Sequence, residues 1–380
     1  MNESEKVLLN LIKSSLFGQQ QTFKAETDWD EVMKAAKEQT VVGIAVYGAP
    51  KEVKYGWQQN LYSEAANCAN ILNAQDELIE LFQKNGIPLV ILKGSAAAVY
   101  YPAPYLRSMG DIDFIVPRDR FEYAREVLKK NGYRLCREES RHISFKKDSL
   151  YFELHHHFSY DKLDIERYID KGLEQRETVS INNHSFPVLP RLGNGIVLLA
   201  HIWEHLQSGL GLRQVIDWMM YVDKELDDKF WDEEFKAVCD ELGLTKLAVT
   251  TTKLCQIYLG LDNMNITWCS EADVTLCKDL LENLLLSGNF GYKHGTGHSF
   301  ETVTTAMRRD GLFHYLQYAG ELNWEVYRKH KWVKPFAWLY QIGRYLKQIL
   351  MTKRGKKEIA GDFTRGKDRY SLLKRLDIMK

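Results

Sequence analysis

The chain has 380 residues, of which 45% are hydrophobic, so it is long enough for two or three domains and apolar enough to build sizeable cores. This composition excludes an intrinsically disordered chain. The formal net charge is zero, which excludes a global electrostatic attraction to nucleic acid or to a membrane surface.

The first 86 residues have a helical pattern. Residues 8–12 and 28–39 place apolar side chains at helical spacing, and residues 62–85 form a longer helical pattern that ends near Gly86. We expect this region to pack on or beside the sheet that follows. Its simplest role is that of a scaffold.

A short apolar run, residues 87–92, predicts a buried strand that leads into the turn Lys93-Gly94-Ser95. Behind the turn, the small-residue segment 96–101 predicts a short helix, for which Ser95 is a candidate N-cap. Backbone N–H groups at the start of a helix suit phosphate oxygens. The turn therefore indicates a phosphate-binding site.

The strongest chemical signal is Asp111-Ile112-Asp113. Strand residues i and i+2 project from the same face, so the two carboxylates are expected side by side. Like charges this close repel each other, and a divalent cation between them relieves the repulsion. Carboxylates suit Mg²⁺, which is often held by one or two of them together with substrate phosphates. The alternative is a chance D-x-D pattern, which many chains contain.

Residues 114–116 continue this strand, and a helix is expected over residues 118–131, closed by Gly132. A strand, a Gly-Ser turn, a short helix and a strand with D-x-D in this order resemble the nucleotidyltransferase superfamily, which has the polymerase-beta-like fold. A wider pattern resembles a bacterial branch of largely uncharacterised nucleotidyltransferases. That pattern consists of Leu92, Lys93, Gly94, Tyr100, Tyr101, Pro102, Arg107, Asp111, Ile112 and Asp113.

The resemblance implies an α+β fold, with a small mixed nucleotidyltransferase sheet, flanking helices and mainly α-helical N-terminal and C-terminal parts. It also implies a third carboxylate on a later strand, for which Glu153 is the candidate. Residues 142–146 and 150–155 flank a turn and predict a hairpin. The alternative for Glu153 is an edge-strand glutamate that faces water. His155 has the same parity as Glu153 and would line the site, whereas neighbouring histidines on a strand face opposite sides, which disfavours a zinc site in residues 155–157.

A later helix contains His201 and His205, which are four residues apart and share one face. Glu204 is displaced from its place in an H-E-x-x-H motif, so we reject a zinc protease. Arg213 and Asp217 are also four residues apart and are expected to pair. In the resembled family, a histidine helix and an Arg…Asp helix follow the catalytic sheet, which would place His205, Arg213 and Asp217 at the cleft wall. A purely structural salt bridge is the alternative.

Two further segments are distinctive. Residues 288–298 form a glycine-rich loop without Walker A spacing, which is either a mobile loop over the site or, more simply, a connector. Residues 342–380 contain twelve Lys or Arg against four Asp or Glu, a net charge of +8. Such a basic tail could contact anionic lipid or RNA, or form a solvated face.

Together, the residues and the resemblance predict a metal-dependent nucleotidyltransferase. It would transfer a nucleoside monophosphate from an NTP, with ATP favoured, to a hydroxyl of a small molecule or protein and release pyrophosphate. The candidate catalytic residues and ligands of Mg²⁺ (or Mn²⁺) are Asp111, Asp113 and Glu153. The candidate nucleotide-binding residues are Lys93, Gly94, Ser95, Arg107, His205, Arg213 and Asp217. The alternatives are a non-catalytic nucleotide-binding or regulatory protein on the same fold, and an interaction protein docked on membrane or RNA through its tail.

Four regions are expected from this reading. They are an N-terminal helical region (1–86), a nucleotidyltransferase catalytic core (87–160), a helical domain lining the cleft (161–300) and C-terminal helices with a basic tail (301–380).

The remaining signals concern the compartment. Six cysteines are scattered without a C-x-x-C pair, which predicts reduced, mostly buried thiols and no structural zinc site. The N-terminus lacks a signal pattern, and no apolar stretch approaches the roughly 18 residues of a membrane span. We therefore expect a cytoplasmic protein without a transmembrane segment.

Overall fold

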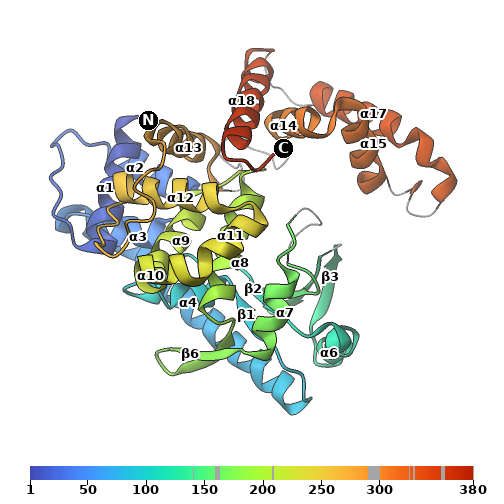
Figure 1. The fold of residues 1–380 in the computed structure, drawn as a ribbon, viewed down its shortest axis with the longest axis horizontal. Helices are drawn as coiled ribbons and strands as arrows, with labels where there is room; N and C mark the ends of the chain where they lie inside the picture. Colours follow the sequence, from blue (N-terminus) through green and yellow to red (C-terminus); the bar gives the residue numbers. More distant parts are fainter. Residues whose placement is uncertain are drawn as a thin grey trace.

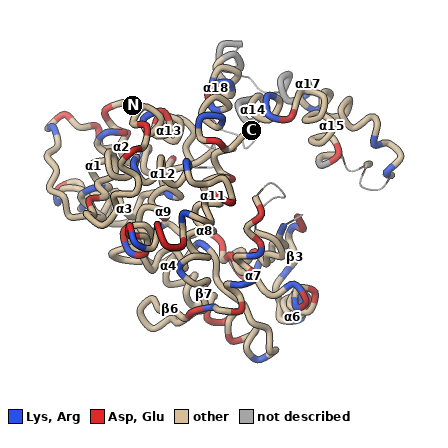
Figure 2. Tube along the Cα trace, viewed as in Figure 1, with Lys and Arg blue, Asp and Glu red and all other residues tan. Residues whose placement is uncertain are grey.

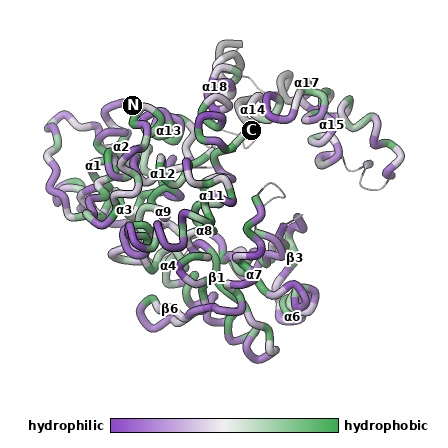
Figure 3. The backbone as a smooth tube through the Cα atoms, viewed as in Figure 1, coloured by the Kyte–Doolittle hydropathy of each residue, from purple (hydrophilic) through white to green (hydrophobic). Residues whose placement is uncertain are grey.

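The computed structural model describes residues 1–380 apart from 140, 159–162, 208, 290–299, 325, 328–329, 352–355 and 380. Helices surround one mixed sheet, which confirms the predicted α+β class (Figure 1). Hydrophobic and hydrophilic stretches alternate along the chain, as expected for elements that bury one face (Figure 3).

The N-terminal region is helical, as predicted. Its helices are α1 (Glu3–Phe17), α2 (Trp29–Glu38), α3 (Val42–Gly48) and α4 (Lys51–Lys84). A capping box begins α1, since the Asn2 side chain accepts from the backbone N–H of Glu5 and the Glu5 carboxylate accepts from the backbone N–H of Asn2, both at 2.8 Å. The long helix α4 begins earlier than the predicted pattern of residues 62–85 and ends just before Gly86.

The sheet carries the four predicted strands and three more. Its members are β1 (Val90–Leu92), β2 (Ile112–Ile115), β3 (Arg134–Glu138), β4 (His142–Lys147), β5 (Leu150–His155), β6 (Glu177–Ile181) and β7 (His184–Val188). Within the described residues the strand order is β3-β4-β5-β2-β1-β7-β6. Strand β2 pairs antiparallel with β1 and parallel with β5, and β1 pairs parallel with β7. The short elements between the first strands are α5 (Gly94–Ala98), η1 (Pro104–Leu106), η2 (Arg118–Arg120) and α6 (Phe121–Lys130).

One face of the sheet is covered by α4 and α6. Ile91, Phe114 and Phe152 project toward these helices and form a core with the apolar face of α4. Phe82 of α4 contacts Phe114 edge to face, with ring centroids 5.5 Å apart. Because strand side chains alternate, Asp113 and the residues that share its parity project toward the opposite face.

A helical layer covers that opposite face. Its members are α7 (Glu166–Glu174), α8 (Arg191–His205), α9 (Leu212–Glu225), α10 (Asp228–Phe230), η3 (Trp231–Phe235), α11 (Lys236–Leu242), α12 (Thr245–Leu254), η4 (Cys255–Leu259) and α13 (Val274–Ser287). Buried residues of this layer, such as Trp218 and Leu280, share one core with Leu8 of α1 and Val32 of α2. The N-terminal helices therefore pack against the helical layer as well as against the sheet.

The C-terminal helices are α14 (Phe300–Asp310), α15 (Leu312–Asn323), η6 (Lys331–Phe336), α17 (Ala337–Met351) and α18 (Lys356–Arg375). In Figure 1, α15 and α17 extend to one side, whereas α18 returns to the body. Arg369 of α18 is 1% exposed and donates to the hydroxyl of Ser287 at 2.7 Å, and Arg375 pairs with Asp279. Basic and acidic residues are interspersed over the described chain (Figure 2). Some of the tail's charge is thus used internally, and its contact with lipid or RNA stays a prediction.

Three remaining predictions can be placed on this fold. Gly288, with φ of +66°, ends α13, and the predicted glycine-rich loop lies outside the described residues from position 290 onward. All six cysteines are free, and Cys136 is the exposed one. Among the described helices, none has the length and apolar character needed to cross a membrane.

Candidate functional site

Three carboxylates meet at the centre of the sheet. Asp113 of β2 lies opposite Glu153 of β5 in the parallel register, and Asp111 directly precedes β2. Ligand oxygens of Asp111, Asp113 and Glu153 all lie within 4.8 Å of one another. Strand β5 lies between β4 and β2, so the alternative of an edge-strand glutamate is wrong. The parallel pairing therefore brings Glu153 to the D-x-D pair from 40 residues away.

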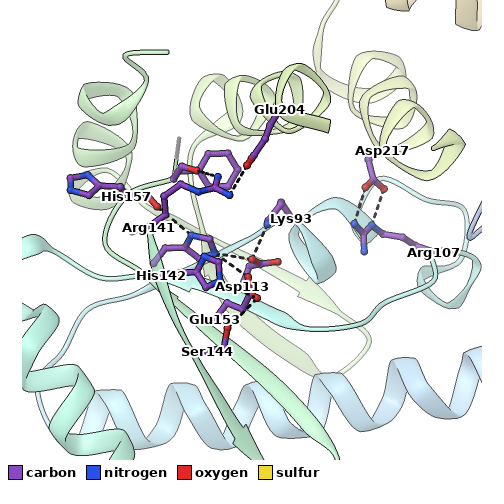
Figure 4. Close-up of polar contacts among 12 residues, drawn as sticks. Lys93, Arg107, Asp113, Arg141, His142, Ser144, Glu153, His157, Glu204 and Asp217 are labelled. Carbon is purple, nitrogen blue, oxygen red and sulfur yellow. Dashed lines mark hydrogen bonds and ion pairs between the residues drawn. The ribbon is translucent and has the colours of Figure 1, made fainter. Parts of the chain in front are cut away.

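The charges in this cluster are unequally balanced. Lys93 Nζ lies 2.8 Å from Asp113 Oδ1 (Figure 4). His155 Nε2 lies 2.8 Å from the same oxygen. Burial opposes ionisation of Asp113, but Lys93 and His155 outweigh it and hold its pKa below the ordinary value. The negative charge of Asp113, with burial, raises the pKa of Asp111. Burial disfavours the Lys93 cation, but Asp113, Asp111 and Glu153 raise its pKa overall, so the ammonium stays charged. The ionised form of Asp111 is therefore disfavoured, and a further cation beside it would offset the repulsion from Asp113.

The carboxylates form one wall of a cavity of about 210 Å³ between the sheet and the helical layer. Predicted residues that line it are Lys93, Gly94, Arg107, Asp111, Asp113, Glu153, His155, His205 and Arg213, and His201 on the same helix as His205 lines it as well. Lining residues that the sequence reasoning did not single out as site residues are Gly110, Arg141, His142, Phe158 and Glu204. The cavity therefore combines an acidic wall on the sheet with cationic and imidazole groups from other elements.

The histidines of α8 face the cavity in their neutral form. The rings of His201 and His205 contact each other edge to face, with centroids 4.4 Å apart. Burial, followed by the positive charges of Lys93 and Arg213, lowers the pKa of His205 to about 3. Burial likewise lowers the pKa of His201 well below its usual value. These imidazoles can hydrogen-bond a ligand without adding positive charge at neutral pH.

Asp217 lies away from the cavity that the other predicted residues line. Arg107 donates to its two carboxylate oxygens from Nε and from a terminal nitrogen, both at 2.8 Å, and the Tyr101 hydroxyl donates to it at 2.8 Å. Asp217 is 1% exposed and is not among the lining residues. Arg213, the expected partner, lines the cavity and donates to the carbonyl of Ser108 at 3.3 Å. The network of Tyr101, Arg107 and Asp217 therefore ties the loop before Asp111 to α9.

Ser95 also differs from the prediction. Helix α5 begins at Gly94, with Lys93 as its N-cap, so the prediction that Ser95 is the N-cap is wrong. The Ser95 hydroxyl is buried and donates to Gln75 on α4, on the side away from the cavity. Lys93 and Gly94 have φ of +49° and +34°, and this reversal directs the Lys93 side chain back toward Asp113. Gly94 lines the cavity, whereas the Ser95 hydroxyl holds the turn through its hydrogen bond to Gln75 on α4.

Sequence reasoning missed Arg141, His142 and Glu204. His142 lies directly opposite His155 in the β4–β5 hairpin, so the predicted hairpin register could have placed it on the same face. Arg141 pairs with Glu204 at 2.5 Å across the cavity and donates to the carbonyl of Phe158 at 3.0 Å. No local sequence pattern predicts this ion pair, because its two residues are 63 positions apart in the chain.

Comparison with known proteins gives a family assignment. A family model described as an uncharacterised nucleotidyltransferase matches residues 25–260. Among solved structures, an antigenic nucleotidyltransferase-like protein from Paracoccidioides brasiliensis is 13% identical, and the match covers 50% of this chain and 92% of that one with a TM-score of 0.33. The search of curated proteins gives no match. The assignment rests on the family model, which spans more than half of the chain and includes every lining residue of the cavity. This chain belongs to the family of uncharacterised nucleotidyltransferases.

Proposed function

We propose that the chain transfers a nucleoside monophosphate from an NTP to a hydroxyl of a small molecule or protein and releases pyrophosphate. The observation that carries this proposal is the convergence of Asp111, Asp113 and Glu153 from two parallel strands on one cavity wall. Lys93 reaches into the same cluster, so negative and positive groups meet where a metal-bound triphosphate would lie.

The three carboxylates fit a hard divalent cation. Their ligand oxygens lie within 4.8 Å of one another, and oxygen donors are those that Mg²⁺ or Mn²⁺ takes. The raised pKa of Asp111 supports the same conclusion, because a cation beside it would favour its ionised form. When bound, such an ion would neutralise phosphate charge and polarise the α-phosphate.

The rest of the cavity suits the phosphate chain. Lys93, Arg141 and Arg213 line it, and cationic nitrogens bind phosphate oxygens strongly when both are shielded from water. The cavity volume of about 210 Å³ is below the roughly 300–1,000 Å³ of ordinary small-molecule pockets. We expect it to hold the triphosphate, with sugar and base extending past its mouth. Ser95 and Asp217 would act as positioning residues, through the turn and through Arg107.

The proposed chemistry is an in-line displacement. The acceptor hydroxyl oxygen forms a bond to the α-phosphorus, the bond from that phosphorus to the bridging oxygen breaks, and pyrophosphate leaves. Glu153, whose side chain is 21% exposed, would take the hydroxyl proton. Lys93 would stabilise the charge that develops on the departing pyrophosphate.

A small molecule or protein is the favoured acceptor because the net charge of the chain is zero and charges are interspersed along it (Figure 2). ATP is the first NTP to test, and a cytoplasmic location fits that choice. A non-catalytic binder would have little use for a third carboxylate beside the D-x-D pair.

Pyrophosphate release tests the proposal. Wild type is incubated with each NTP, Mg²⁺ and pools of hydroxyl-bearing small molecules or proteins, and pyrophosphate and acceptor mass are measured. We expect release with wild type, none with Asp113→Asn, and full release with Asp119→Asn, whose side chain is 75% exposed on η2. Circular dichroism checks that Asp113→Asn is folded. Nucleotide binding without pyrophosphate release under every condition would support the non-catalytic alternative instead.

A further inference from the structure

Two imidazoles lie at the side of the carboxylate cluster that is nearer to β4. His142 of β4 is directly opposite His155 of β5, and Glu153 lies two residues before His155 on the same strand. All three side chains line the cavity, and Figure 4 shows His142 and Glu153 on one face of the sheet. One ligand atom from each of His142, Glu153 and His155 lies within 4.8 Å of the other two. Nitrogen and oxygen donors therefore converge beside the all-oxygen set.

The spacing of these donors fits a single metal ion. Two ligands bound at about 2.1 Å lie roughly 3.0 Å apart in octahedral and about 3.4 Å apart in tetrahedral coordination. His142 Nε2 lies 3.4 Å from Glu153 Oε1, and His155 Nε2 lies 3.7 Å from Glu153 Oε2 and 2.8 Å from Asp113 Oδ1. Small rotations of the side chains would place an ion within bonding distance of two nitrogens and two oxygens.

The surroundings of the two rings point to the same conclusion. His155 Nδ1 lies 3.3 Å from the carbonyl oxygen of His157, while Nε2 faces the Asp113 carboxylate. Both ring nitrogens thus face acceptors, and when Nδ1 donates to the carbonyl, Nε2 is oriented as metal-binding histidines are. His142 is 8% exposed, and its Nδ1 is buried without a hydrogen-bond partner among the described residues. The other ring nitrogen, Nε2, faces Glu153 Oε1 at 3.4 Å, so Nε2 is the nitrogen that a metal ion beside Glu153 would bind.

We propose that His142, Glu153 and His155, with Asp113 as a fourth donor, form a binding site for a divalent transition-metal ion of the Zn²⁺ type. Imidazole nitrogen favours such ions over Mg²⁺, which prefers an all-oxygen set like that of Asp111 and its neighbours. The two positions share Glu153 and Asp113 but differ in His142 and Asp111. The site goes beyond the proposed transfer reaction, since it binds metal whether or not the chain turns over an NTP.

Metal binding by the full chain tests this site. Chelator-treated protein is dialysed against Co²⁺, a spectroscopic substitute for Zn²⁺, and against Mg²⁺, and bound metal is measured by mass spectrometry and visible absorption. Wild type should bind one Co²⁺ tightly and show absorption of a nitrogen-and-oxygen site. His142→Ala should weaken Co²⁺ binding at least about tenfold. Asp111→Asn should weaken Mg²⁺ binding and leave Co²⁺ binding unchanged.

His156→Ala is the matched control. His156 is the neighbour of His155, but its ring packs against Phe121, with centroids 4.8 Å apart. This variant should bind Co²⁺ like wild type. Equal loss of Co²⁺ in His156→Ala and His142→Ala would mean that the ion binds through the neighbouring histidines 155–157 and would overturn the proposal. Absence of tight Co²⁺ binding to wild type would also overturn it, whether or not the variants fold, and would leave the imidazoles as hydrogen-bonding partners of the carboxylates. Neither result bears on pyrophosphate release, so the two proposals fail separately.

Discussion

The buried pair of Arg107 and Asp217 gives a quantitative test of how the site is held. Their side chains are 3% and 1% exposed and are joined by two hydrogen bonds of 2.8 Å. Asp217→Asn keeps the shape of the side chain but removes its charge, which leaves the Arg107 guanidinium buried without a counter-charge. Loss of one partner of a buried pair costs about 3–5 kcal/mol of unfolding free energy. We expect a loss of that size, measured by urea denaturation followed by circular dichroism.

Two comparisons make the test specific. Glu31→Gln removes a charge from an exposed pair with Lys34, whose side chain is 61% exposed, and should change stability far less. The double variant Arg107→Met with Asp217→Leu buries no charge and should recover much of the stability lost by Asp217→Asn. Equal urea midpoints for Asp217→Asn and Glu31→Gln would refute the reasoning, because they would mean that the carboxylate is not buried against Arg107.

Three further predictions concern charge, pH and packing. Lys93→Gln removes an ammonium that competes with the metal ion and attracts phosphate. It should therefore raise the Mg²⁺ affinity of the carboxylate cluster on the order of tenfold and weaken NTP binding. Calorimetry that shows both affinities unchanged would contradict this. His205, with a pKa of about 3 in the fold and 6.5 as the ordinary value, binds a proton only when the chain unfolds. Lowering the pH from about 7 to about 5 should therefore cost wild type up to about 2 kcal/mol relative to His205→Gln, and parallel pH profiles would disprove it. Gly195→Ala would drive a methyl group into the buried ring of Tyr221 and should lower the free energy of unfolding by about 1–3 kcal/mol. Gly56→Ala, at an exposed helix position with open space around it, should raise it by about 0.5–1 kcal/mol. Thermal unfolding measures both, and equal shifts of the melting temperature would contradict the close packing of Gly195 against Tyr221.

The acidic wall could be predicted from the sequence because strand periodicity pairs the D-x-D carboxylates and the family resemblance points to Glu153 as the third one. Asp113 and Glu153 each lie inside short apolar runs, and the period of two places both on one face once those runs pair. The same parity predicted that His155 would line the cavity, and it does. What the period could not give is the order of the strands, which makes β5 the parallel neighbour of β2.

The parts that sequence reasoning missed depend on distant packing. Asp217 was expected to pair with Arg213 four residues away, yet its hydrogen bonds reach Arg107, 110 residues earlier in the chain. Ser95 was expected to cap its own helix, but the contact that orients it is made by Gln75, on a helix that precedes the sheet. In both cases the local rule is sound, and a buried partner from another element decides the outcome.

Calorimetric titration of ATP, GTP, CTP and UTP, with and without Mg²⁺, tests the central claim most directly when it is done on wild type and on Asp113→Asn. We expect that at least one NTP binds wild type only when Mg²⁺ is present and that folded Asp113→Asn loses this binding. Equal binding to both proteins, or binding that ignores Mg²⁺, would contradict the claim that Asp111, Asp113 and Glu153 hold a metal-bound triphosphate.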